Sequence, residues 1–197
     1  MDNVERRTDP TDTAVVSGDY FTRLLNIEDA EELTCYYRNN KECHAPWSPA
    51  FPEDFFTNGC QLQRLLEYEE KYELEREYRF AISPVNNPLE IEGVINLTNV
   101  ERGVFQNGRV GYSISQQCAG KGIMTAMLGE VVTFAFSYLY LHRLEANVIP
   151  RNFASIRVLE KCGFMHIGRS PKYLLINGVW EDHLHYALLR DDFTIAG

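Results

Sequence analysis

The sequence has no run of apolar residues long enough to cross a membrane. A transmembrane helix needs about 18 consecutive apolar residues, and the 197-residue chain contains no such stretch. Its first residues, Met-Asp-Asn-Val-Glu-Arg-Arg, are too polar for the apolar part of a signal peptide. We therefore expect a soluble, cytoplasmic protein that does not bind membranes.

Paired cysteines are also missing. The five cysteines are odd in number and form no Cys-x-x-Cys pair, so neither a disulfide framework nor a zinc site is indicated. His183 and His185 would share one face of a strand, but no third metal ligand has a suitable spacing. We predict no metal. Cys118 and Cys162 lie within the two motifs described below, and we expect them to be buried small hydrophobes rather than nucleophiles.

Basic residues are too few for a nucleic-acid-binding protein. The chain has 28 acidic and 19 basic residues and a net charge of −9, which would repel a phosphate backbone on average. The same charge would attract a basic polypeptide, although most acidic proteins have no basic partner. We therefore expect no direct contact with nucleic acid.

Repeats, low-complexity tracts and linkers are missing too, which favours one domain over residues 14–197. Residues 1–13 are polar and aperiodic and are expected to form a disordered lead-in. The expected strands span residues 15–25, 78–83, 91–96, 109–115, 142–149, 164–176 and 179–189. The expected helices span residues 26–38, 53–77, 120–138 and 152–161, with an aromatic loop at residues 44–56. This mixture predicts an α/β (α+β) fold with a central mixed sheet.

A glycine-rich turn precedes the apolar helix at residues 120–138. Gly120 and Gly122 allow a sharp turn and a close approach of the backbone to a ligand, and the helix start offers unpaired N–H groups. A diphosphate group would fit such a turn. The turn is neither a dinucleotide fingerprint nor a Walker loop, since Thr125 occupies the third glycine position and Lys121 is followed by glycine. A purely structural turn remains the alternative.

A second motif follows about thirty residues later. Asn152 is placed to cap a short helix, and Gly163 comes just after the end of that helix. Gln-x-x-Gly-x-Gly at residues 117–122, followed by Asn-x-x-Ser and Leu-Glu-Lys-x-Gly-Phe within residues 152–164, resembles the GNAT superfamily. Within it, the chain is most similar to the RimJ/RimL group of ribosomal-protein N-terminal acetyltransferases, closest to the alanine-directed RimJ type. The terminal Tyr-Leu-Leu-Ile-Asn-Gly-Val-Trp hairpin at residues 173–180 supports that narrower likeness.

The resemblance implies a GNAT fold with a seven-stranded, mixed but mostly antiparallel sheet flanked by helices. Its fourth and fifth strands would splay apart and hold acetyl-CoA in the gap, without a metal. The pantetheine arm would pair with the backbone of residues 112–115, and the diphosphate would lie on residues 117–125. The expected cofactor-binding residues are Tyr112, Ser113, Ile114, Ser115, Gln117, Cys118, Ala119, Gly120, Lys121, Gly122, Ile123, Met124, Thr125, Asn147, Asn152 and Ser155.

The resemblance also suggests the catalytic residues, Ser155 and Asn152. Many superfamily members have a tyrosine general acid where this chain has Leu159, so Ser155 is the candidate to stabilise or protonate the departing thiolate. Asn152 would hold the cofactor arm or the reacting geometry. A glutamate common in RimJ/RimL members is replaced by Ile167. The base that replaces it is left open among Glu101, Glu145, Asp182 and a chain of waters.

The family resemblance favours acetylation of a protein N-terminal α-amine, in a small-subunit ribosomal protein that begins with Ala or Ser. A small-molecule amine acetyltransferase and a non-catalytic acetyl-CoA-binding module are the alternatives, because the fold does not fix the acceptor. Trp47, Phe51, Phe55 and Phe56 either line a substrate groove or belong to the core. The oligomeric state is left as monomer or homodimer.

Overall fold

The fold alternates strands and helices around one sheet. The computed structural model describes residues 16–193, so the expected disorder of residues 1–13 lies outside the described residues. The strands are β1 (Val16–Ser17), β2 (Tyr20–Leu24), β3 (Tyr78–Pro84), β4 (Gly93–Glu101), β5 (Asn107–Ile114), β6 (Arg143–Val148), β7 (Met165–Ile176) and β8 (Val179–Leu189). The α-helices are α1 (Ala30–Asn39), α2 (Lys41–His44), α3 (Asn58–Glu73), α4 (Ile123–Ser137) and α5 (Phe153–Lys161). Short 3-10 turns are η2 (Ile27–Asp29), η3 (Ala45–Trp47), η4 (Glu53–Phe56), η5 (Gln116–Cys118) and η6 (Arg190–Asp192).

The sheet runs in the order β1-β2-β3-β4-β5-β6-β8-β7 and is antiparallel except for the pair β5–β6. This confirms the mixed, mostly antiparallel sheet expected from the sequence. The strand count differs because the chain turns back at Gly18 and Asp19, so residues expected to form one strand form β2 and the two-residue edge strand β1. The strands expected to be fourth and fifth are therefore β5 and β6.

Two element boundaries differ from the sequence prediction for local reasons. The helix expected from residue 53 begins at Asn58, since Pro52 starts a 3-10 turn and the Thr57 side chain caps α3 by accepting from the Cys60 N–H. It ends at Glu73, because Glu75 adopts a left-handed conformation with φ 54°. The aromatic segment before it forms short turns rather than a continuous loop.

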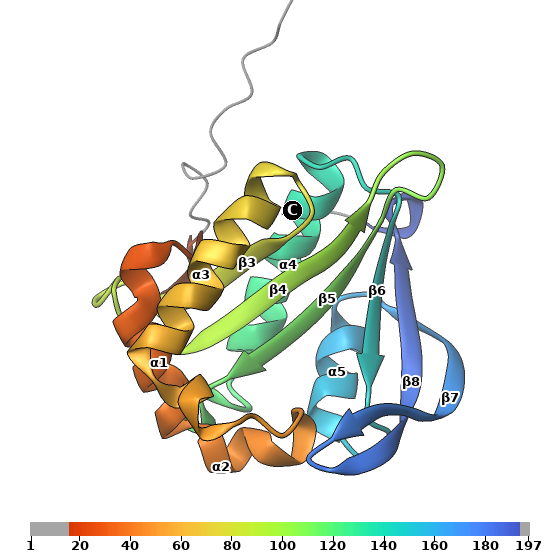
Figure 1. Cartoon of the computed structure of the whole chain (residues 1–197). Helices are drawn as coiled ribbons and strands as arrows, with labels where there is room; N and C mark the ends of the chain where they lie inside the picture. Colours follow the sequence, from red (N-terminus) through yellow and green to blue (C-terminus); the bar gives the residue numbers. More distant parts are fainter. Residues whose placement is uncertain (1–15, 194–197) are drawn as a thin grey trace, which may run out of the picture.

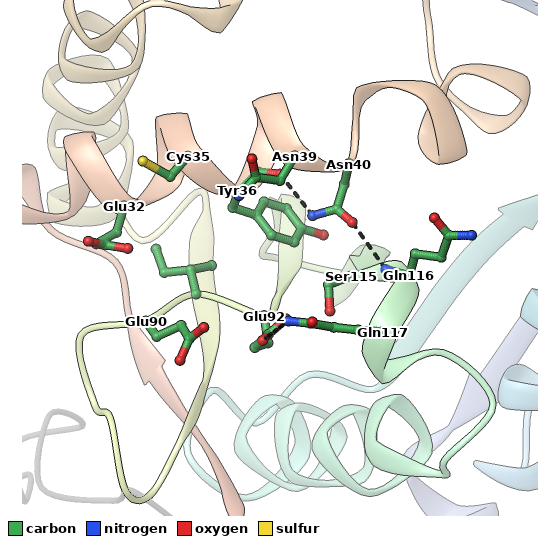
Figure 2. Close-up of a pocket in the computed structure, with 11 residues that line it drawn as sticks. Glu32, Cys35, Tyr36, Asn39, Asn40, Glu90, Glu92, Ser115, Gln116 and Gln117 are labelled. Carbon is green, nitrogen blue, oxygen red and sulfur yellow. Dashed lines mark hydrogen bonds between the residues drawn. The ribbon is translucent and has the colours of Figure 1, made fainter.

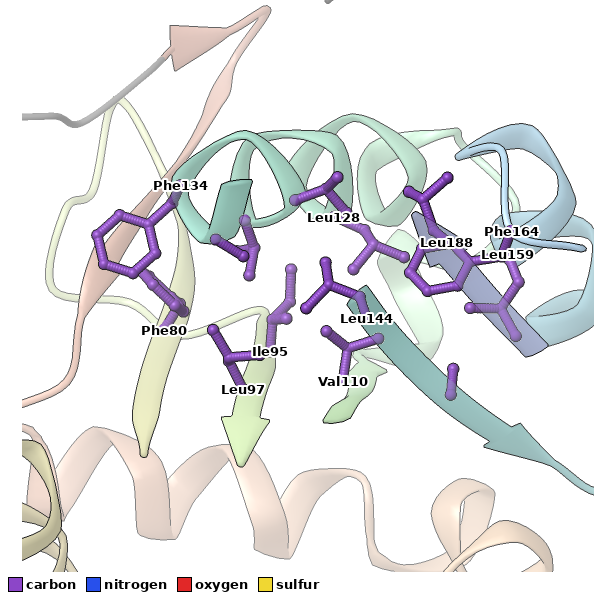
Figure 3. Packing of buried hydrophobic residues seen from close by; sticks show 14 of the residues in the cluster. Phe80, Ile95, Leu97, Val110, Leu128, Phe134, Leu144, Leu159, Phe164 and Leu188 are labelled. Carbon is purple, nitrogen blue, oxygen red and sulfur yellow. The ribbon is translucent and has the colours of Figure 1, made fainter. Parts of the chain in front are cut away.

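Helices cover both faces of the sheet (Figure 1). One apolar cluster joins the sheet to α4 and α5 and includes Leu128, Leu144 and Leu159, each at most 1% exposed (Figure 3). A second cluster joins the other face to α1 and α3 through Leu33, Tyr36 and Leu65. Helix α4 is apolar nearly all round because it lies deep in the first cluster. The sheet is thus packed against helices on both faces.

The slot arises where β5 and β6 separate. Their parallel ladder has only three residue pairs, Asn107 with Arg143 through Arg109 with Glu145. Beyond Arg109, the residues of β5 have no ladder partner on the β6 side, and the two strands diverge in Figure 1. The splayed pair of strands that the family resemblance implied is therefore present. Separately, none of the helices within residues 16–193 is long and apolar enough to serve as a membrane-spanning segment.

Candidate active site

The free edge of β5 offers backbone groups to a ligand in the slot. The Ser115 N–H donates to the Glu92 carbonyl at 2.7 Å, so Ser115, Ser113 and Gly111 direct their backbone toward β4. The alternate residues, Tyr112 and Ile114, direct their backbone N–H and C=O groups away from β4, toward the slot. His44 Nε2 lies 2.9 Å from the Ile114 carbonyl oxygen, which leaves the Tyr112 groups and the Ile114 N–H to pair with an extended arm.

The glycine turn has the geometry expected of a phosphate-binding loop. Gly120 and Gly122 have φ values of 76° and 83°, and a Cβ at either position would meet nothing within 4 Å. Backbone conformation rather than crowding therefore requires these glycines, and open space lies above them. Gly122 is the N-cap of α4 and supplies no side-chain cap, so the first N–H groups of this long helix stay available to an anion. Lys121 is exposed beside them.

Several expected cofactor residues have their side chains engaged elsewhere. Cys118 is 3% exposed, and its sulfur lies 3.5 Å from the Tyr20 hydroxyl. This hydrogen bond, together with burial, raises the pKa of Tyr20 to about 12. Gln117 donates its side-chain amide to the Glu92 carboxylate, and Met124 is buried in the core. Gln117, Cys118 and Met124 therefore have mainly their backbone to offer a ligand.

Tyr112 and Ser155 meet across the slot. The Tyr112 hydroxyl donates to the Ser155 carbonyl at 3.0 Å and lies 2.9 Å from the Ser155 hydroxyl oxygen. Since Tyr112 has one hydroxyl proton, Ser155 donates to the tyrosine oxygen in this arrangement. Burial raises the pKa of Tyr112 well above its usual value, which keeps it protonated at neutral pH. This role of the Tyr112 hydroxyl could not be predicted from the sequence, because its partner is 43 residues away.

Asn152 is the N-cap of α5, as the sequence predicted. Its side-chain oxygen accepts the Ser155 N–H at 3.1 Å and so fixes the first turn that carries Ser155. The cap uses the oxygen and leaves the side-chain NH₂ for another partner. Asn152 thus positions Ser155 directly, whichever further role it has toward a ligand.

Asn147 belongs to a polar chain that the sequence did not reveal. Its side-chain oxygen lies 2.7 Å from His185 Nδ1, and His185 Nε2 lies 2.8 Å from the Ser170 hydroxyl. An amide oxygen can only accept, so His185 donates to Asn147 from Nδ1. The Tyr173 ring packs edge-on against the His185 ring, with 4.9 Å between the ring centroids. The nearby His183 is 3% exposed, and burial lowers its pKa.

The three carboxylates considered as bases are poorly placed. Glu101 pairs in register with Asn107, and Glu145 pairs with Arg109, at the end where β5 and β6 are joined. Glu145 also forms an ion pair with Arg143 at 2.8 Å. Asp182 is half-buried, and its hydrogen bond from Arg169 lowers its pKa. These placements favour the remaining candidate, a chain of waters.

The opposite end of the slot is framed by side chains from distant segments. Arg151 forms an ion pair with Glu181 at 2.7 Å and lies over the Trp47 ring at 5.5 Å. The Asn177 N–H at the tip of the β7–β8 hairpin donates to the Ser48 carbonyl at 3.1 Å. Trp47 is 39% exposed, so it can contact a substrate.

Phe55 and Cys162 have structural roles. Of the two cysteines expected to be buried, Cys118 is buried, whereas Cys162 is only partly buried. Phe55 is 5% exposed and packs on Tyr37, so it belongs to the core rather than to a groove. Burial raises the pKa of the Cys162 thiol to about 11, and its sulfur donates to the Thr125 carbonyl, which disfavours a nucleophilic thiolate. Within residues 16–193 no three His, Cys, Asp or Glu side chains come close enough to bind a metal ion.

Comparison with known proteins identifies the class to which this fold and slot belong. Residues 21–165 match the acetyltransferase (GNAT) domain family. Because this match covers most of the chain, the protein belongs to the GNAT acetyltransferases.

Individual relatives narrow the assignment to the RimJ/RimL type. The probable N-acetyltransferase YjcK of Bacillus subtilis is 40% identical over 87% of this chain and 94% of its own length. The ribosomal protein uS5-alanine N-acetyltransferase of Escherichia coli is 35% identical over 87% of this chain and 88% of its own. The crystal structure of the ribosomal-protein-S5-alanine acetyltransferase of Vibrio fischeri aligns with a TM-score of 0.88 and 35% identity, over 93% of this chain and all of that one.

One similar protein of known structure was solved with a coenzyme A derivative. Mycobacterium smegmatis RimJ in complex with CoA-disulfide aligns with a TM-score of 0.84 and 26% identity, over 89% of this chain and 84% of that one. The protein is therefore an N-acetyltransferase similar to RimJ and RimL.

Proposed function

We propose that the protein transfers the acetyl group of acetyl-CoA to the N-terminal α-amine of a protein, and that its acceptor is a ribosomal protein beginning with Ala or Ser. Two relatives that are 35% identical over most of the chain carry names specifying a ribosomal-protein alanine acceptor. The observation that carries the acetyl-CoA assignment is the slot itself, where an unpaired edge of β5 leads to the uncapped N-terminus of α4.

The chain's own groups suit this reaction. The backbone of Tyr112 and Ile114 would orient the thioester arm, and the turn at Gly120 and Gly122 would hold the diphosphate. The bound co-substrate supplies an activated acetyl thioester. Ser155 lies beside the protonated Tyr112, and its hydroxyl can turn from the tyrosine oxygen to donate to the departing thiolate. If the serine passes its proton to the sulfur, the proton that the amine loses would return to the serine through water.

The proton of the incoming amine can leave through water. An α-amino group has a pKa of about 8, so freeing its lone pair at neutral pH costs only roughly 1.4 kcal/mol. A strong carboxylate base is therefore not required, which agrees with the unfavourable positions of Glu101, Glu145 and Asp182.

The decisive experiment measures release of free CoA thiol from acetyl-CoA with three classes of acceptor. These are peptides with N-terminal Ala or Ser, N-terminally blocked peptides with one lysine, and small amines. We expect turnover with the first class. Preferred turnover of a small amine would select the small-molecule alternative, and binding of acetyl-CoA without turnover of any amine would select the non-catalytic module.

A further inference from the structure

A cavity lies between α1 and the start of the glycine turn. Its volume is about 480 Å³. It lies between α1, the segment leading into β4, and the residues that follow β5 (Figure 2). The lining residues are Glu32, Cys35, Tyr36, Asn39, Asn40, Glu90, Ile91, Glu92, Ser115, Gln116 and Gln117.

The lining is acidic and has no cationic side chain. Glu32, Glu90 and Glu92 come from two separate segments, and neither lysine nor arginine is among the lining residues. Glu92 is 7% exposed and accepts from Gln117 through one carboxylate oxygen. Glu90 accepts from Asn87 at 3.1 Å, and the structure gives Glu32 no ion pair within residues 16–193. A diphosphate would be repelled from such a cavity, so it is not part of the expected cofactor site.

Ser115 gives independent evidence that the cavity takes a polar ligand. The residue is only 4% exposed, and its hydroxyl has no hydrogen-bond partner in the structure. Figure 2 shows this hydroxyl directed toward the Glu92–Gln117 pair. Leaving a buried hydroxyl unpaired costs free energy, and a ligand N–H group in the cavity would relieve that cost.

The arrangement of the Glu32, Glu90 and Glu92 carboxylates favours one kind of cation. Within the described residues they do not form a group that could surround one metal ion. Separated carboxylates instead match a ligand whose cationic nitrogens are themselves separated along a flexible chain. The hydroxyl of Ser115 and the amide oxygens of Asn39 and Gln116 would accept further N–H groups. We propose that this cavity binds a linear polyamine, at a site separate from the acetyl-transfer slot.

A ligand in this cavity would touch the wall that it shares with the glycine turn. The Gln116 N–H donates to the Asn40 side-chain oxygen at 3.0 Å, and Gln117 is held by Glu92. Both contacts fix the start of the turn that precedes Gly120. A polyamine that engages Glu92 competes with Gln117 for this carboxylate, so its binding changes the affinity for acetyl-CoA, and the coupling is reciprocal.

Calorimetry with spermidine tests the site directly. We expect saturable binding to the full-length protein at low ionic strength. Binding to the Glu32→Gln/Glu90→Gln double variant should be about tenfold weaker, since two solvent-accessible charge pairs are lost. The Glu28→Gln/Glu31→Gln double variant removes the same charge from exposed positions near the start of α1 that do not line the cavity. It should bind spermidine as the unmodified protein does.

Ser115→Ala separates a ligand-binding role from a structural one. Removal of an unpaired buried hydroxyl should raise the melting temperature of the free protein while weakening spermidine binding a few-fold. A lower melting temperature would show that the hydroxyl is satisfied in the free protein and would contradict the argument from Ser115.

Three further results would overturn the proposal. One is the lack of saturable binding, and another is equal weakening in the two double variants. Acetylation of spermidine that depends on Glu32 and Glu90 would make the cavity an acceptor site instead of a separate one. That result is distinguishable from failure of the proposed peptide acetylation, which is measured without spermidine.

Discussion

The slot between β5 and β6 is bordered by two regions built from different kinds of groups, which we call the backbone end and the acceptor end. The backbone end, proposed for acetyl-CoA, consists of the free edge at Tyr112 and Ile114 and the turn at Gly120 and Gly122. The acceptor end, where the chain leaves β6, is held by side-chain contacts such as Arg151 with Glu181 and Trp47. A backbone site tolerates change in most side chains but not in its glycines, whereas a side-chain site can vary with the acceptor.

Gly122→Val should produce the largest effect, because it acts on the backbone end. Valine is strongly disfavoured at a φ of 83°, so the turn would have to change shape. Loss of two amide–phosphate bonds at roughly 1.5–3 kcal/mol each predicts about 1,000-fold weaker acetyl-CoA binding by calorimetry. Gly59→Val is the control, since Gly59 lies exposed in α3 with open space around it. Unchanged affinity in a folded Gly122→Val protein would remove the turn from the cofactor site.

Selection between amines tests whether the acceptor end lacks a strong base. At pH 7, the neutral fraction of a lysine side chain, with a pKa of about 10.4, is roughly 200-fold smaller than that of an α-amine with a pKa of about 8. A peptide beginning with Ala and containing an internal lysine should therefore be acetylated at its N-terminus, as located by fragmentation mass spectrometry. The α-amine rate should also rise as the pH approaches 8. Acetylation of the lysine with a free N-terminus would contradict the water-mediated mechanism.

Ser155→Ala tests the contact between the two regions, where Ser155 of α5 meets Tyr112 of β5. We expect kcat to fall about tenfold to 100-fold. This loss is small for removal of a general acid, because the Tyr112 hydroxyl remains as a second hydrogen-bond donor. KM for acetyl-CoA should change little if the serine acts only as the thiolate leaves. Ser137→Ala, at the exposed end of α4, is the control. Wild-type kcat when chemistry limits the rate would exclude Ser155 from the mechanism.

Arg151→Ala should have the smallest effect, confined to the acceptor end. Arg151 is half exposed, and an exposed ion pair contributes about 0.2–1 kcal/mol, so KM for the peptide should rise roughly two- to fivefold. Affinity for acetyl-CoA should not change. Arg190→Ala, which removes a comparably exposed arginine from a looser pair at 3.9 Å, is the control. A loss of acetyl-CoA binding in Arg151→Ala would show that the two ends are not independent.

The same contrast explains how much could be predicted from the sequence. The glycine turn and the Asn152 cap are local, because their conformations depend on neighbouring residues, and both were found from short motifs. The strand and helix order followed from the periodicity of apolar residues. The hairpin at β1 was missed because β-branched and aromatic residues lie on both sides of its turn.

Contacts between distant segments could not be predicted in this way. The Tyr112–Ser155 pair, the Asn147–His185–Ser170 chain and the unpaired Ser115 hydroxyl all depend on which strands lie side by side. Two histidines two residues apart indicated a shared strand face for His185, but not that it would pair with Asn147. The motifs located the cofactor end, and the tertiary structure was needed for the rest.

The short β5–β6 ladder also has a consequence for stability. Three residue pairs are all that join β1–β5 to β6–β8 within the sheet, so the sheet is nearly divided into two halves. An extended arm bound along Tyr112 and Ile114 would act as an additional strand and satisfy backbone groups that now face the gap. Hydrogen exchange at these amides should slow on binding, and a ligand at 100 times its Kd would stabilise the fold by about 2.7 kcal/mol. If the proposed site is correct, the thioester arm of acetyl-CoA would thus complete the sheet of the enzyme that uses it.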